Sequence, residues 1–160
     1  MIRRCAASDF GAVLVIINQA AEAYRGVIPA DRWHDPYMSA KELEAEIEAG
    51  VNFWGWDEEG VLIGVMGIQE VRDATLIRHA YVRSAAQGRG IGSSLLAFLT
   101  ARAQGKLLVG TWAAAEWAVR FYQSHHFRLV SPEEKDRLLT MYWSIPVRQK
   151  ETSVVLEYSR

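Results

Sequence analysis

The sequence has little cysteine and no long hydrophobic stretch, and each shortage excludes a class of protein. Cys5 is the only cysteine among 160 residues, so the chain can form neither an intrachain disulfide nor a cysteine-rich zinc site. The longest apolar run near the amino terminus spans residues 12–17, far short of the roughly 20 residues that cross a bilayer. Ser8 and Asp9 interrupt the apolar character that a secretory signal needs. We therefore expect no membrane partner and a cytoplasmic location.

An excess of charge of one sign is lacking as well. The chain has 18 Lys and Arg against 19 Asp and Glu, so nothing indicates a nucleic-acid partner. Half of the residues are apolar, which is enough for a sizeable core without a structural metal. Because no internal repeat or low-complexity linker divides the chain, we expect one domain over residues 1–160.

Periodic apolar residues predict a series of strands and helices. The strands are expected at residues 1–5, 51–56, 61–71, 74–82, 106–112, 128–130 and 152–158. The helices are expected from Ser8 or Asp9 to about 23, over 40–50, from 91 to about 99, over 114–124 and over 131–143. The strands from 51 to 82 follow closely and favour antiparallel pairing, whereas a helix separates 74–82 from 106–112 and favours a parallel pair. The pattern predicts an α/β (α+β) fold with a mixed central sheet flanked by helices.

Three glycines, at 88, 90 and 92, stand directly before a segment with helical periodicity. A P-loop would need a lysine after Gly92, and the Rossmann fingerprint would need a glycine where Ser93 stands, so both patterns fail. A third pattern, Q/R-x-x-G-x-G/A between a strand and a helix, is matched by Gln87, Gly90 and Gly92. The unpaired N–H groups of a helix start suit a pyrophosphate, although the glycines could instead merely permit a tight turn.

The order of elements together with this motif resembles the GNAT superfamily of N-acetyltransferases, which use acetyl-coenzyme A. The resemblance extends from residue 1 to about 131 and more loosely to the end of the chain. It implies a single acyl-CoA N-acyltransferase domain whose mixed sheet has about six to seven strands. It also implies transfer of the acetyl group of acetyl-CoA directly to an amine in a ternary complex, without a metal. The alternative is a non-catalytic acyl-CoA-binding sensor module, and a toxin that acetylates charged transfer RNA is disfavoured by the absence of a strong basic face.

The resemblance also implies which residues bind the cofactor. The main chain of the strand before the glycines would hold the pantetheine arm, and the glycine loop would hold the pyrophosphate. The expected cofactor-binding residues are Ala80, Tyr81, Val82, Gln87, Gly88, Arg89, Gly90, Ile91, Gly92 and Ser93.

Two catalytic roles are expected. The segment around Phe121 and Tyr122 resembles the family's helix whose tyrosine protonates the departing thiolate, which makes Tyr122 the candidate acid. His126 departs from the family pattern, because a glycine usually stands before the following phenylalanine. The general base is open: Leu76 occupies the place of the glutamate that many relatives carry there. We prefer Glu70 acting through a water, with Asp73, His79 or no protein base as alternatives.

The acceptor is expected to enter beside the segment after the first helix. Its aromatic residues could stack on a flat or cationic amine or could simply fill the core; the candidate substrate-binding residues are Tyr24, Trp33, Tyr37 and His79. A small-molecule or peptide amine would fit equally. The adjacent His125 and His126 are expected on the surface rather than at a metal. The helical insertion at 131–143 could cover the site or support a homodimer.

Overall fold

A computed structural model describes residues 1–159 of the chain and shows one mixed seven-stranded sheet. The strand order is β1-β2-β3-β4-β5-β7-β6, in which β4 and β5 are parallel and all other neighbours are antiparallel. The strands are β1 (Ile2–Arg4), β2 (Asn52–Glu58), β3 (Val61–Val71), β4 (Ala74–Val82), β5 (Lys106–Trp112), β6 (Phe127–Leu129) and β7 (Ser153–Tyr158). The expected fold class is therefore confirmed, with seven strands in the predicted order.

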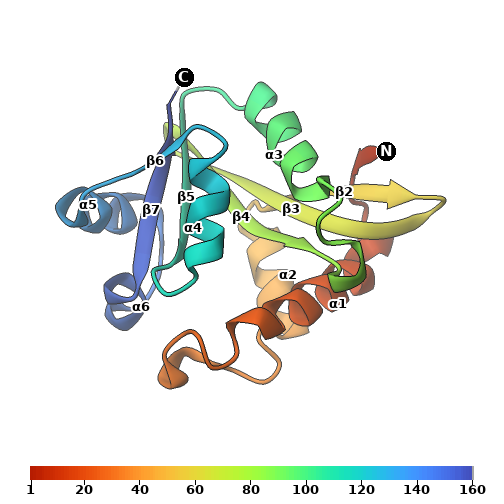
Figure 1. Cartoon of the computed structure of the whole chain (residues 1–160), viewed down its shortest axis with the longest axis horizontal. Coiled ribbons are helices and arrows are strands. Elements are labelled where there is room, and N and C mark those ends of the chain that lie inside the picture. The colour runs from red at the N-terminus through yellow and green to blue at the C-terminus, as the bar shows by residue number, and fades with distance from the viewer. Residues whose placement is uncertain (160) are drawn as a thin grey trace.

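Six α-helices cover the two faces of this sheet (Figure 1). They are α1 (Phe10–Ala20), α2 (Ala40–Glu48), α3 (Ile91–Arg102), α4 (Glu116–Gln123), α5 (Pro132–Tyr142) and α6 (Val147–Glu151). The apolar residues of α1 and α2 pack on one face with the side chains of β2 and β3, and α5 packs on the same face over β5 and β7. The opposite face carries α3 and α4. Four short 3-10 helices, η1 (Ala7–Asp9), η2 (Ala21–Tyr24), η3 (Ala30–Arg32) and η4 (Ser84–Ala86), complete the described helices.

The parallel strands β4 and β5 pair only over their first halves. Residues Ala74–Ile77 pair with Lys106–Val109, after which β5 remains paired with β7 while β4 remains paired with β3. Figure 1 shows the two strands diverging from this point. The divergence leaves a gap in the middle of the sheet, between α1 and η2 on one side and α3 and α4 on the other.

A β-bulge in β4 accompanies this divergence. Gly67 pairs with Arg78 and Val65 pairs with Tyr81, so two residues of β4 stand opposite Met66. His79, the first of these two, has a φ of 54° in the left-handed region. A bulge of this kind interrupts the alternation of side chains between the two faces of a strand.

Among the described residues, no helix combines the length and the apolar character needed to cross a bilayer.

Candidate active site

The glycine loop forms the start of α3. Gly88 and Gly90 have φ values of 83° and 77°, and Gly90 is the N-cap residue of the helix. A Cβ atom at either position would meet nothing within 4 Å, so these residues are glycines because of their backbone conformation and not because of crowding. No side chain caps this helix end, which leaves its first N–H groups directed at the open space beside the loop. The arrangement is one that binds anions.

The other predicted cofactor-binding residues divide into three groups. Ala80, Tyr81, Val82, Gln87 and Gly92 line the cavity described next. Ile91 is buried in the core that α3 shares with the sheet.

The two remaining polar residues of the loop have protein partners. Arg89 forms an ion pair with Glu58, at the end of β2. Ser93 Oγ lies 2.9 Å from Nε2 of His125, which is half-buried, whereas His126 is exposed. This contact joins the first turn of α3 to the residues that follow α4.

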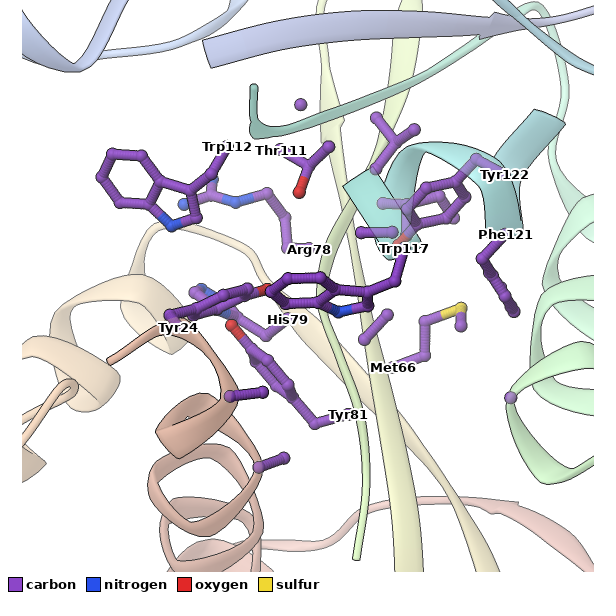
Figure 2. Close-up of a pocket in the computed structure, with 18 of the residues that line it drawn as sticks. Tyr24, Met66, Arg78, His79, Tyr81, Thr111, Trp112, Trp117, Phe121 and Tyr122 are labelled. Atoms are coloured by element: carbon purple, nitrogen blue, oxygen red, sulfur yellow. The ribbon is translucent and has the colours of Figure 1, made fainter. Parts of the chain in front are cut away.

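A cavity of about 350 Å³ occupies the gap between β4 and β5. Its walls come from β4, from β5, from α4, from η2 and from the segment after α5, which contributes Trp143 and Ile145. Figure 2 shows the rings of Tyr24 and Trp117 side by side across this cavity, with His79 and Tyr81 near Tyr24 and with Tyr122 on the α4 side. The rings of Tyr24 and Trp117 are stacked with centroids 5.9 Å apart. Residues from both sides of the sheet line the cavity, and eight of them are tyrosines, tryptophans or phenylalanines: Tyr24, Tyr37, Tyr81, Trp112, Trp117, Phe121, Tyr122 and Trp143.

Tyr122 is presented to the cavity by α4. It is buried, and its ring packs edge-on against Phe121 and Phe127 at centroid distances of 5.2 and 5.6 Å. Burial raises the pKa of its phenol well above the usual value, so Tyr122 keeps its proton at neutral pH. A neutral phenol facing a cavity is a proton donor. The chain leaves this region through His126, whose φ is 71°.

Three tyrosines gather on the other side of the gap. The ring centroids of Tyr24 and Tyr81 are 6.3 Å apart and those of Tyr24 and Tyr37 are 5.5 Å apart, and Nε1 of Trp112 donates to the Tyr37 hydroxyl at 2.8 Å. Burial raises the pKa of Tyr37 to about 12 and also raises the pKa values of Tyr24 and Tyr81. Trp33 is not part of the cavity wall but packs against Tyr37 with ring centroids 5.7 Å apart.

The two carboxylates considered as general bases lie away from this cavity. Glu70 is exposed near the end of β3, where it pairs with Thr75, and it is not part of the wall. Asp73 accepts a hydrogen bond of 2.5 Å from the Tyr142 hydroxyl, a contact that lowers the pKa of Asp73. The position of Glu70 therefore gives no support to the expected role.

The structure places beside Arg78 and His79 a carboxylate that the sequence did not predict there. Glu46 of α2 lies 2.7 Å from Nη2 of Arg78 and 2.5 Å from Nε2 of His79. Glu46 belongs to a run of charged residues on α2 that is typical of a solvated helix face, and nothing in its spacing distinguishes it from its neighbours. Among the described residues, no group of three or more His, Cys, Asp or Glu could hold a metal ion.

Known acetyltransferases resemble this chain in sequence and in fold. The chain is 27% identical over 151 residues to the peptidyl-lysine N-acetyltransferase YiaC of Escherichia coli, a match that covers 93% of this chain and 99% of that protein.

Solved structures show the same fold. The PaiA N-acetyltransferase of Thermoplasma acidophilum, in complex with coenzyme A, superposes with a TM-score of 0.71 at 13% identity. The match covers 100% of this chain and 98% of the PaiA chain. The ribosomal-protein-S18-alanine N-acetyltransferase of Escherichia coli has a TM-score of 0.69 at 17% identity, with coverage of 99% and 92%.

The family model described as "Acetyltransferase (GNAT) domain" matches residues 16–142, a range that runs from the second half of α1 to the end of α5 and includes the gap between β4 and β5 and the glycine loop. The chain belongs to the GNAT family of acetyltransferases, as its glycine motif and order of elements indicate.

Proposed function

We propose that this enzyme transfers the acetyl group of acetyl-CoA directly to a primary amine while both are bound. The observation that carries the proposal is the single cavity between β4 and β5, which reaches the glycine loop, Tyr122 and the tyrosines of the opposite face. A donor and an acceptor that enter from opposite faces of the sheet meet there. The solved structure of PaiA, which holds coenzyme A, supports this choice of donor.

The donor site is assigned to the face that carries α3 and α4. The N–H groups at the start of α3 bind the diphosphate, and the edge of β4 that β5 has left offers main-chain groups at Ala80 and Val82 to the pantetheine amides. Gly88, Gly90 and Gly92 keep the loop free of side chains along this path. Arg89 adds positive charge once it exchanges Glu58 for a phosphate.

The reaction needs one bond to form and one to break. Acetyl-CoA supplies a thioester whose carbonyl carbon is open to a nucleophile. The neutral acceptor amine forms the new C–N bond as the C–S bond breaks, and the Tyr122 hydroxyl donates its proton to the departing thiolate sulfur. The nitrogen that has gained the acetyl group then loses one proton to become the amide, and this proton restores the Tyr122 phenol. The raised pKa of Tyr122 keeps this proton in place until the sulfur gains charge.

We assign the acceptor to the class of amines that end an aliphatic stem, such as the lysine side chain of a peptide. The stacked rings of Tyr24 and Trp117, with Tyr37 and Trp112 beside them, offer flat apolar walls to a methylene chain and π faces to its ammonium group. The relative YiaC, which is a peptidyl-lysine N-acetyltransferase, supports the same class.

Release of free coenzyme A thiol tests the proposal. Wild-type enzyme with acetyl-CoA and an N-acetylated peptide carrying a single lysine should release thiol and yield the acetylated peptide by mass spectrometry. Tyr122→Phe should lower kcat about 100-fold while acetyl-CoA binding stays within about two-fold, because only the proton donor is lost. Tyr158→Phe removes a hydroxyl outside the cavity wall and serves as the matched control.

Two results would contradict this assignment. If Tyr122→Phe turned over at the wild-type rate, the acid would be another group. If acetyl-CoA bound but a broad panel of amines released no thiol, the chain would be an acyl-CoA-binding module.

A further inference from the structure

The bulge in β4 turns two consecutive side chains toward the same helix. In a regular strand, Arg78 and His79 would point to opposite faces, but both meet Glu46 of α2. The 54° φ of His79 shows that the backbone departs from extended geometry at this residue. His79 thereby lines the acceptor side of the cavity, and its ring packs between Phe53 and Tyr81 at centroid distances of 6.1 and 6.4 Å.

The contact with Glu46 determines which ring nitrogen of His79 is available. Burial alone would raise the pKa of Glu46, but the neighbouring His79 and Arg78 outweigh it and lower that pKa, so Glu46 is a carboxylate. Because a carboxylate can only accept, its 2.5 Å approach to Nε2 favours the neutral tautomer that has the proton on Nε2 and the lone pair on Nδ1.

His79 is also the group left by elimination. No described Asp, Glu, Lys or Cys lines the cavity. The titratable groups that do are Tyr24, Tyr37, Arg78, His79, Tyr81 and Tyr122. The four phenols have raised pKa values and hold their protons, and the Arg78 guanidinium does not give its proton up.

We infer that His79 is the general base of the reaction and that Glu46 is its positioning residue, an inference that rests on the proposed function. Nδ1 of His79 takes one proton from the acceptor ammonium, which leaves a neutral amine and an imidazolium. Glu46 holds the ring in the required tautomer and stabilises the positive charge that the ring gains. The proton returns to solvent after transfer, while Tyr122 supplies the separate proton that the thiolate needs.

The kinetic test uses the single-lysine peptide and acetyl-CoA over a range of pH. His79→Gln should lower kcat/KM about 100-fold at neutral pH and remove the part of the profile that rises with pH, because neutral imidazole is the active form. Glu46→Gln should lower kcat/KM about ten-fold and move that rise to lower pH, because the imidazolium loses its carboxylate. Glu48→Gln changes the same charge on an exposed part of α2 and should leave the profile unchanged.

A second acceptor separates a lost base from a damaged site. The same peptide with an aminooxy group in place of the lysine ammonium is already neutral at pH 7 and needs no base. His79→Gln should slow this acceptor less than five-fold. An equal loss with both acceptors, or a loss below three-fold with the lysine peptide, would overturn the inference.

Nitrogen NMR of histidine-labelled wild-type protein provides a test that needs no turnover. The resonances lost in His79→Gln should show a proton on Nε2 and a bare Nδ1 at a pH where the ring is neutral. A proton on Nδ1 would overturn the assigned base even if the enzyme is active. Absence of turnover with every amine would instead refute the proposed function, so the two failures are distinguishable.

Discussion

Arg89 illustrates how one residue of the glycine loop can have two partners. It is the only charged side chain among residues 87–93, and it is paired with Glu58, which also accepts a hydrogen bond of 3.2 Å from Nε1 of Trp56. Arg89 lowers the pKa of Glu58, so this carboxylate stays charged at neutral pH. If Arg89 also binds the diphosphate, Glu58 competes with the donor for the same guanidinium.

Glu58→Gln should therefore strengthen the binding of coenzyme A. We expect a roughly two- to five-fold lower Kd at low salt, because an exposed ion pair is worth little, and a smaller difference at high salt. Isothermal titration at low and at high salt measures the Kd of coenzyme A for the variant and for the wild-type protein. Glu59→Gln, which removes the same charge at the next position, serves as the control, and an equal gain in that variant would show a general effect of charge.

At the same scale, the sequence named Tyr122, His79 and the residues of β4 as candidates, and all of them line the cavity, but it did not predict the contact of His79 with Glu46. Strict alternation along 74–82 puts Arg78 and His79 on opposite faces of the sheet, and the bulge opposite Met66 brings both of them to Glu46. A bulge depends on how two strands pair, and no local pattern of residues in β4 predicts it. The contact between Glu46 and His79 joins positions 33 residues apart, which a single sequence does not reveal.

At the scale of elements, the periodicity of apolar residues predicted most helices and strands correctly. Ser39 caps α2 by accepting from the N–H of Glu42, as the spacing of the two residues indicates. The first helix differs, because α1 ends at Ala20 and the chain continues to Tyr24 as the 3-10 helix η2. Tyr24, at the end of this 3-10 helix, lines the cavity. Tertiary contacts rather than helix propensity account for the change from α-helix to 3-10 helix.

The end of α4 offers a test at this scale. His126 has a φ of 71°, a conformation that costs an L-residue energy and that glycine adopts freely, as the family pattern has it. His126→Gly should raise the free energy of unfolding by about 0.5 kcal/mol, measured by urea denaturation. His125→Gly should lower it, because that residue contacts Ser93 and packs on Phe121. A destabilised His126→Gly protein would contradict this account of the turn.

At the scale of the whole molecule, segments far apart in the sequence enclose one cavity. The Arg148 guanidinium in α6 forms an ion pair of 2.9 Å with Asp31 in η3, which joins the segment after α5 to the segment after α1. Trp143 and Ile145, between α5 and α6, form part of the cavity wall. The sequence identified residues 131–143 as a helix but could not show what it covers, because its packing on β5 and β7 joins residues far apart in the sequence.

Binding of coenzyme A to two matched glycine variants tests the central claim most directly, namely that the loop before α3 holds the donor's diphosphate. Gly90 and Gly26 have nearly equal φ values, 77° and 76°, and a Cβ atom at either would meet nothing within 4 Å. A glutamate at both positions therefore introduces similar backbone strain and the same charge. Only the one at 90 faces the proposed diphosphate site.

Isothermal titration at matched salt should show that Gly90→Glu weakens coenzyme A binding by at least about 30-fold, or about 2 kcal/mol, and that Gly26→Glu stays within about two-fold of wild type. If Gly90→Glu bound coenzyme A as tightly as the wild-type protein, or if both variants lost affinity equally, the loop would not be the donor site.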